Sequence, residues 1–154
     1  MFETATLLPF LIRAKKATYI GSGAKLPSSR PDSHDLAYSE GELTYRDSYF
    51  GGTDFIGQEC VWDRGAPIWS MAYYGYILRP NLINGAQAAA LLRQALSQPQ
   101  SQGRLLDNLE FSLDEMHYAI ASQGTVDHFS GRETITVQDD LAYALDYFGG
   151  MIKL

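Results

Sequence analysis

The sequence predicts one α+β domain, residues 1–154, built on a curved antiparallel sheet of about six or seven strands with one or two packed helices. A length of 154 residues is typical of a single domain with its own core. A composition of 45% hydrophobic and 19% charged residues indicates a compact fold rather than extended disorder. Runs rich in aromatic and β-branched residues outnumber the helical patterns and favour an antiparallel sheet.

The first predicted element is a short amphipathic helix over residues 7–16, because its apolar side chains recur at helical spacing. Thr6 is its expected N-cap, and Pro9 then lies in the first turn, where a missing N–H costs little. Its basic residues are expected to complement the negative end of the helix dipole: Arg13, Lys15 and Lys16. Residues 21–35 are dense in Gly, Ser, Pro and Asp and predict a long surface loop.

Residues 36–78 predict two successive antiparallel hairpins. The first turns near Glu40–Gly41, and the second joins residues 55–62 to residues 68–78 through Arg64–Gly65. Asn84 and Gln87 form a capping-box pattern before a second helix over residues 86–96, which a polar linker over residues 97–103 follows. Residues 116–152 predict three more strands, with turns near residue 124 and over residues 138–140. No internal repeat is evident in the sequence.

Charge and cysteine content limit the expected partners and compartment. A net charge of −6 and a pI near 4.9 would repel a nucleic-acid backbone, so no nucleic-acid partner is expected. Cys60 is the single cysteine, which excludes an intrachain disulfide and fits a reducing compartment. The N-terminal residues resemble neither a signal peptide nor a membrane span. We therefore expect a cytoplasmic protein without a membrane partner, as a monomer or a small homo-oligomer.

The common motifs of nucleotide, hydrolase and metalloprotease chemistry are not found in this sequence. It contains no phosphate-binding loop, no GxSxG elbow, no HExxH pair and no dinucleotide fingerprint. The three histidines lie far apart in sequence and are expected to be solvated rather than to bind a metal: His34, His117 and His128. Neither a cofactor nor a metal is implied.

Carboxylates on apolar strand faces are the candidate site residues. Because alternate side chains of a strand share a face, counting in twos places Asp47, Glu59 and Glu133 among apolar and aromatic neighbours. With a two-residue turn at Arg64–Gly65, the face of Glu59 would lie opposite Ser70 and Tyr74. An isolated buried carboxylate is costly unless it is paired or protonated, so acids in such positions tend to be functional.

Two interpretations of these acids are open. They can line one cavity, as general acids or bases or as contacts for a polar ligand, together with four aromatic side chains: Trp62, Trp69, Tyr73 and Tyr74. Alternatively, each acid binds an arginine, a tyrosine hydroxyl or a backbone amide and only stabilises the fold. We expect at least one acid to be buried, with a raised proton affinity or a partner such as Arg30, Arg132 or a tyrosine hydroxyl. Glu59 is expected to have the fewest alternative partners.

Two further features are relevant to a site. Arg30, in a Ser-rich stretch, can bind a ligand carboxylate or phosphate, or it can pair with one of the three acids. Both faces of the second hairpin are largely apolar, and we expect intramolecular packing to cover the second face. Cys60 is expected there as a small buried hydrophobic residue rather than a nucleophile.

Several sequence blocks resemble a family of uncharacterised bacterial domains. They are residues 14–19 (AKKATY), 28–31 (SSRP), 45–49 (YRDSY), 54–57 (DFIG), 67–71 (PIWSM), 73–75 (YYG) and 129–133 (FSGRE). The resemblance extends from about residue 10 to residue 152. In that family the domain is sometimes fused behind a Cro/C1-type helix-turn-helix, which implies a sensor or ligand-binding role. This sequence departs from that arrangement, because it contains no helix-turn-helix pattern.

Three functional hypotheses follow. The leading one is a small-molecule-binding, sensor-like domain whose aromatic and acidic cavity contacts its ligand through Asp47, Glu59, Glu133 and Arg30. The second is a metal-independent acid–base enzyme, such as an isomerase, cyclase or hydrolase, in which a pair of these acids transfers protons. The third is a protein-interaction module or homodimer that buries the apolar hairpin face.

Overall fold

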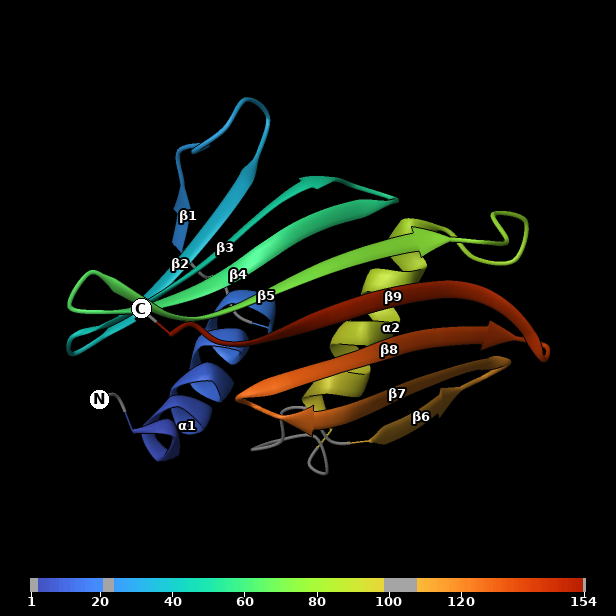
Figure 1. Ribbon diagram of the computed structural model, residues 1–154. Coiled ribbons are helices and arrows are strands. Elements are labelled where there is room, and N and C mark those ends of the chain that lie inside the picture. Colours follow the sequence, from blue (N-terminus) through green and yellow to red (C-terminus); the bar gives the residue numbers. More distant parts are fainter. Residues whose placement is uncertain (1–2, 21–23, 99–107, 154) are drawn as a thin grey trace.

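The structure is a computed structural model that describes residues 3–20, 24–98 and 108–153 (Figure 1). In these ranges it contains one nine-stranded antiparallel sheet and two α-helices, and both helices lie behind the sheet in Figure 1. The strand order is β1-β2-β3-β4-β5-β9-β8-β7-β6. The α+β class and the antiparallel sheet are therefore confirmed, whereas the predicted count of six or seven strands was wrong.

The elements fall into two consecutive groups. The first group contains α1 (Thr4–Lys15), a π-helical turn η1 (Lys16–Ile20), β1 (Ala24–Leu26), β2 (His34–Glu40), β3 (Leu43–Gly51), β4 (Phe55–Asp63) and β5 (Ala66–Ile77). The second group contains α2 (Gly85–Ser97), β6 (Leu109–Leu113), β7 (Met116–Thr125), β8 (His128–Val137) and β9 (Asp140–Met151). The hairpins β2–β3 and β4–β5 and the strands β7, β8 and β9 confirm the predictions for those segments.

Two edge strands were missed. β1 lies within the segment predicted as a long loop, and β6 follows the predicted linker, most of which lies outside the described residues. Both strands are short and lie at opposite edges of the sheet, where a strand pairs on one side only. α2 begins with the predicted capping box, in which the Asn84 side chain accepts from the Gln87 backbone N–H at 2.9 Å.

The first helix begins earlier than predicted. Its N-cap is Glu3 rather than Thr6, so Pro9 lies beyond the first turn. The Thr6 hydroxyl instead donates to the Glu3 carbonyl oxygen at 2.8 Å. After Lys15 the backbone widens into η1, where the Thr18 hydroxyl donates to the Ala14 carbonyl oxygen at 2.9 Å. Such wide turns are rare and frequently occur at functional sites.

A β-bulge changes the register of the second hairpin. The turn at Arg64–Gly65 is the predicted two-residue turn, but the register shifts between Val61 and Trp62. Glu59 therefore lies opposite Met71 rather than Ser70. The shift also turns Tyr73, instead of Tyr74, toward the face that carries Glu59.

The two groups of elements repeat one arrangement, so the expectation of no internal repeat was wrong at the level of structure. Each group places a helix before an antiparallel meander, α1 before β2–β5 and α2 before β6–β9. The buried residues of the two helices have the same spacing: Leu7, Phe10, Leu11 and Ala14 in α1, and Ala88, Leu91, Leu92 and Ala95 in α2. The corresponding strand pairs are Phe55 and Phe129, Gly57 and Gly131, Glu59 and Glu133, Tyr73 and Tyr147, and Gly75 and Gly149.

These strand pairs share one separation in sequence (for Glu59 and Glu133, 133 − 59 = 74). β5 and β9 pair at the centre of the sheet, with Tyr73 directly opposite Tyr147. Because Tyr147 is itself the counterpart of Tyr73, the two groups are related by a pseudo-twofold axis through this pair. The strands β3, β4 and β5 thus correspond to β7, β8 and β9.

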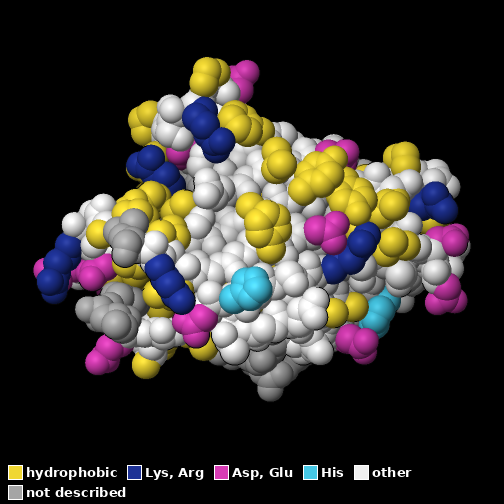
Figure 2. Space-filling view, in the orientation of Figure 1, with side chains coloured by type: hydrophobic (Ala, Val, Ile, Leu, Met, Phe, Trp, Pro, Cys, Tyr) yellow, Lys and Arg dark blue, Asp and Glu magenta, His cyan; other side chains and the backbone are white. Residues whose placement is uncertain are grey.

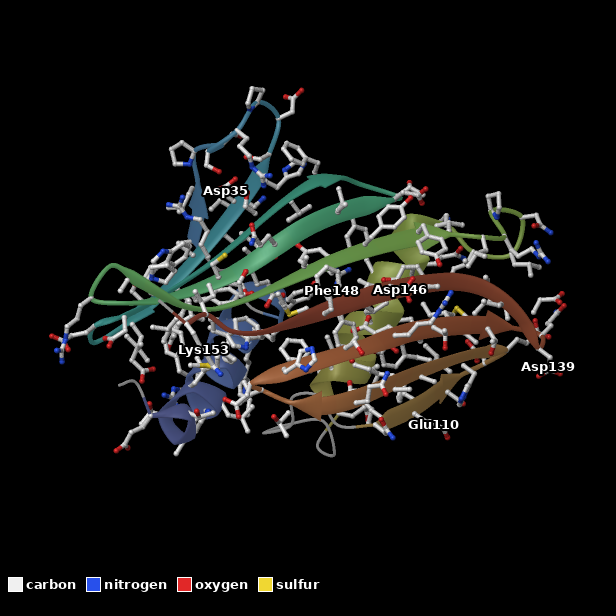
Figure 3. All side chains as sticks on the ribbon, viewed as in Figure 1. Asp35, Glu110, Asp139, Asp146, Phe148 and Lys153 are labelled. Atoms are coloured by element: carbon white, nitrogen blue, oxygen red, sulfur yellow. The ribbon has the colours of Figure 1, made fainter. Side chains whose placement is uncertain are left out.

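The sheet buries one face under the helices and leaves the other partly exposed. The exposed face carries large apolar side chains, namely Ile56 (54% exposed), Tyr74 (46%) and Phe148 (66%). Figure 2 views this face, and Figure 3 shows Phe148 and Asp146 on β9. The expectation that the chain itself packs over this face was therefore wrong for Ile56 and Tyr74. None of the described helices is long and apolar enough to cross a membrane.

Candidate functional site

Two buried acids lie side by side beneath the helices. Asp47 on β3 and Glu59 on β4 are direct neighbours across the ladder, and they are 2% and 1% exposed. Both belong to the buried face, as the alternation along each strand predicted. Like charges directly opposite each other destabilise a sheet, so this pair requires a cation or a bound proton.

Lys15 supplies the cation. It lies at the end of α1, one helical turn beyond the buried residue Leu11. Its ammonium nitrogen lies 2.8 Å from Glu59 Oε2 and 3.0 Å from Glu59 Oε1, and it also contacts Met71 Sδ at 3.6 Å. The expectation that Lys15 only complements the helix dipole was wrong. The expectation that Glu59 has the fewest partners of the three acids was wrong as well, because Lys15 is a dedicated cation for Glu59.

Asp47 is held by a hydrogen bond instead. The Tyr73 hydroxyl donates to Asp47 Oδ1 at 2.6 Å. Burial and the neighbouring charge of Glu59 raise the pKa of Asp47 from 3.8 to about 7, although the hydrogen bond from Tyr73 opposes this shift. The Asp47 carboxyl group therefore gains and loses its proton near neutral pH.

Glu133 on β8 is the counterpart of Glu59 in the second half of the sheet. Burial raises the pKa of Glu133 from 4.5 to about 7, against the opposing effects of Lys15 and of the Tyr118 hydroxyl. No described lysine or arginine forms an ion pair with Glu133. The expectation that at least one of the acids is buried with a raised proton affinity or a dedicated partner is thus confirmed by Asp47, which Tyr73 binds, and by Glu59, which Lys15 binds. Glu133 is half-buried.

Buried polar atoms without a well-formed hydrogen bond lie around Glu133. They are Glu133 Oε2 and the hydroxyl oxygens of Tyr118 on β7 and Tyr143 on β9. The side chains of Tyr118 and Tyr143 are 0% and 1% exposed, and burial and the charge of Glu133 raise the pKa of both hydroxyls. The Tyr45 hydroxyl on β3, beside Glu59, is a further buried atom of this kind. Buried polar atoms are normally paired, so each of these requires an explanation.

Tyr19 joins the two halves of this cluster. Burial raises the pKa of its hydroxyl well above the usual value, and the charges of Asp47, Glu59 and Glu133 raise it further. The hydroxyl is thus within electrostatic reach of all three acids. Because Tyr19 belongs to η1, the wide turn after α1 positions it over the sheet.

Arg30 belongs to a different cluster. This cluster is centred on Asp35, which Figure 3 labels. Asp35 accepts hydrogen bonds from the hydroxyls of Ser29 (2.6 Å), Ser33 (2.6 Å) and Ser48 (3.1 Å). Burial alone would raise the pKa of Asp35, but these hydrogen bonds lower it to about 2. Arg30 donates to Ser48 Oγ at 2.8 Å and lies 4.4 Å from the centre of the Phe50 ring. The described contacts of Arg30 therefore do not include Asp47, Glu59 or Glu133, so the alternative in which Arg30 pairs with one of these acids is wrong.

Of the four predicted aromatic ligand contacts, Tyr73 lies at the acids. Trp69 is a core residue that stacks on Phe129 at 5.8 Å and donates to the Val126 carbonyl oxygen at 3.1 Å. Tyr74 lies on the exposed face, and Trp62 is half-buried opposite Pro67 beyond the bulge. The predicted placement of Tyr74 and Trp62 beside the acids was wrong. The bulge turns Tyr73 instead of Tyr74 toward the face of Glu59. Trp62 comes three residues after Glu59 on β4, so strand alternation places it on the opposite face.

Five residues of the cluster were not predicted: Lys15, Tyr19, Tyr45, Tyr118 and Tyr143. The position of Lys15 one turn after Leu11 was a usable signal, because it continues the apolar stripe of the helix. Strand alternation likewise placed Tyr45 on the face of Asp47. The proximity of Tyr118 and Tyr143 to Glu133 depends on the pairing of β7, β8 and β9, which one strand alone does not reveal.

Other candidate chemistry is not supported in the described part of the chain. No group of three or more His, Cys, Asp and Glu side chains in these ranges is placed to hold a metal. Cys60 is half-buried with Sγ 3.1 Å from Ser70 Oγ, and burial raises the pKa of its thiol. An open surface hollow lies elsewhere, beside the β2–β3 turn, and is lined by Glu3, Thr6, Glu40, Glu42, Leu43, Asp63 and Arg64.

The fold and the cluster define a class of protein: a duplicated two-helix antiparallel domain with ionisable groups in its interior. The chain belongs to a family of domains of unknown function, DUF5680, whose family model matches residues 47–152. Asp47, Glu59, Tyr73, Tyr118, Glu133 and Tyr143 lie within the matched residues, whereas Lys15, Tyr19 and Tyr45 precede them. No curated protein and no solved structure matches the chain.

Proposed function

We propose that this domain binds a small polar molecule between the buried face of the sheet and the helices. The observation that supports the proposal is the set of buried polar atoms without a well-formed hydrogen bond: the hydroxyls of Tyr45, Tyr118 and Tyr143 and Glu133 Oε2. A buried polar atom left unpaired costs about 1–3 kcal/mol. A fold that only needed stability would replace these tyrosines by phenylalanine, whereas a bound ligand would supply the missing hydrogen bonds.

The chemistry of the cluster restricts the ligand. Three carboxyl groups face one ammonium group, so an anionic ligand would add like charge to the interior. The tyrosine hydroxyls both donate and accept hydrogen bonds, and ionised carboxylates only accept. A neutral or cationic ligand with several N–H or O–H groups therefore fits the cluster best.

The test is a ligand-observed NMR screen of a fragment set with equal numbers of cationic, neutral and anionic members. We expect cationic or neutral fragments to bind the wild-type protein and to bind at least about tenfold more weakly to Tyr118→Phe and Tyr143→Phe. Tyr74→Phe is the matched control, because Tyr74 lies on the exposed face. A screen without binders, or binders unaffected by both interior variants, would contradict the proposal.

An acid–base enzyme is the second candidate, and a specific observation favours it. Asp47 and Glu133 both have pKa values raised to about 7, which is the range in which a carboxyl group serves as a general acid or base at neutral pH. The same screen separates the two functions. If a bound fragment is converted over hours and Asp47→Asn stops the conversion without abolishing binding, the site is catalytic.

A further inference from the structure

We infer that the ligand of this domain carries a primary ammonium group, and that this group binds Glu133 as Lys15 binds Glu59. The inference rests on the proposed function, because it assigns a ligand class to the same interior site. It is carried by a comparison of the two halves of the sheet and by the buried tyrosine hydroxyls beside Glu133.

The first half shows how this fold binds an ammonium group. Glu59 and Glu133 occupy corresponding positions on β4 and β8, and Tyr45 and Tyr118 occupy corresponding positions on β3 and β7. At Glu59, the Lys15 ammonium lies 2.8 Å and 3.0 Å from the two carboxylate oxygens. The buried strand face therefore accommodates a carboxylate–ammonium pair next to a tyrosine.

The second half keeps the carboxylate and changes the residue that would supply the cation. The matching buried stripes of α1 and α2 make Leu96 the counterpart of Lys15, since each directly follows the last buried alanine of its helix. The carboxylate of Glu133 consequently receives no ammonium group from α2. The acid opposite Glu59 is also replaced, because Ile120 lies opposite Glu133 where Asp47 lies opposite Glu59.

The polar atoms around Glu133 match the hydrogen-bonding capacity of one ammonium group. A primary ammonium has three N–H donors and no acceptor. The atoms without a well-formed hydrogen bond are three oxygens, one each on Glu133, Tyr118 and Tyr143, and they come from three adjacent strands, β8, β7 and β9. Each oxygen can accept one N–H. The Tyr143 hydroxyl retains its own proton as a donor for the rest of the ligand, whereas the Tyr118 hydroxyl directs its proton toward Glu133.

Isothermal titration calorimetry with n-butylammonium chloride tests this inference, with tetramethylammonium chloride and 1-butanol as matched probes. Tetramethylammonium keeps the charge but has no N–H, and 1-butanol keeps the alkyl chain but has no charge. We expect n-butylammonium to bind at least about tenfold more tightly than either probe. We also expect Glu133→Gln to weaken its binding at least about tenfold. Glu110→Gln, which removes the same charge at a side chain that is 77% exposed, should leave binding unchanged.

The possible outcomes separate the inference from the proposed function. Equal binding of 1-butanol or tetramethylammonium, or no n-butylammonium binding alongside neutral hits in the fragment screen, would overturn the ammonium assignment and leave a polar-ligand site. No binder of any class would overturn both. If Lys15→Met weakens binding and Glu133→Gln does not, the ammonium group binds in the first half of the sheet, and the assignment to Glu133 is wrong. If Glu133→Gln does not fold, Tyr118→Phe and Tyr143→Phe provide the same comparison.

Discussion

Replacing Lys15 by methionine tests the interior charge balance directly. The substitution leaves an unbranched apolar side chain, one atom shorter than that of lysine, and removes the ammonium that lies 2.8 Å from Glu59 Oε2. At that separation and an effective dielectric constant of about 20, the attraction is about 6 kcal/mol before desolvation is subtracted. Removing one partner of a buried pair typically costs about 3–5 kcal/mol. Because the Lys15 side chain is 22% exposed, we expect the lower end, a loss of about 3 kcal/mol.

The assay is urea unfolding of the wild-type protein, Lys15→Met, Glu59→Gln and the double variant. The double variant should be more stable than Lys15→Met, because it leaves no unpaired charge in the interior. An uncompensated buried carboxylate favours its protonated form, so Lys15→Met should be less destabilised at about pH 5 than at about pH 8. A loss below about 0.5 kcal/mol, or additive single effects at both pH values, would refute the importance of this pair.

Three further predictions concern the same interior. Because the pKa values of Asp47 and Glu133 are raised to about 7, the folded protein holds protons that the unfolded chain releases. The free energy of unfolding should therefore fall from about pH 4 to pH 7 and level off above, and urea unfolding that shows a rise across this window would contradict it. Tyr73→Phe removes the donor to Asp47 and should cost about 1.5–3 kcal/mol above pH 7, and less at about pH 5; a pH-independent loss would argue against an ionised acceptor. A Cβ at Gly131 would collide with the Tyr147 ring, so Gly131→Ala should cost about 1–3 kcal/mol, whereas Gly52→Ala, where a Cβ meets nothing, should be neutral in the same thermal melts.

The parts of the fold that were predicted correctly depend on short stretches of sequence. The turns at Gly41 and Gly65 both have positive φ and mark the two hairpins, and the capping box at Asn84 marks the start of α2. The bulge after Val61 has no comparable local signal. It results from how β4 and β5 pack, and it decides whether Tyr73 or Tyr74 faces the acids.

The candidate site was also predicted only as far as short stretches of sequence determine it. The alternation of side chains along one strand is a local property, and it placed Asp47, Glu59 and Glu133 on the buried face. The partner of Glu59 comes from α1, and nothing in strand periodicity shows where a helix crosses a sheet. The duplication was missed because the corresponding residues are few and widely spaced, and it becomes evident only when β5 and β9 pair through Tyr73 and Tyr147.

The differences between the two halves indicate where they perform different tasks. Each half keeps a tyrosine ring across a glycine, Tyr73 over Gly57 and Tyr147 over Gly131, and this shared feature is accounted for by packing alone. The two halves share one carboxylate, Glu59 in the first and Glu133 in the second, but they do not share the charged groups around it. The first half contains Asp47 and Glu59 with Lys15, so a single proton on Asp47 makes it electrically neutral. The second half contains Glu133 without an ion-pair partner among the described residues, so either a proton or a cationic ligand must balance its charge. Because that proton competes with the ligand and the pKa of Glu133 is raised to about 7, binding at Glu133 should strengthen as the pH rises through about 7.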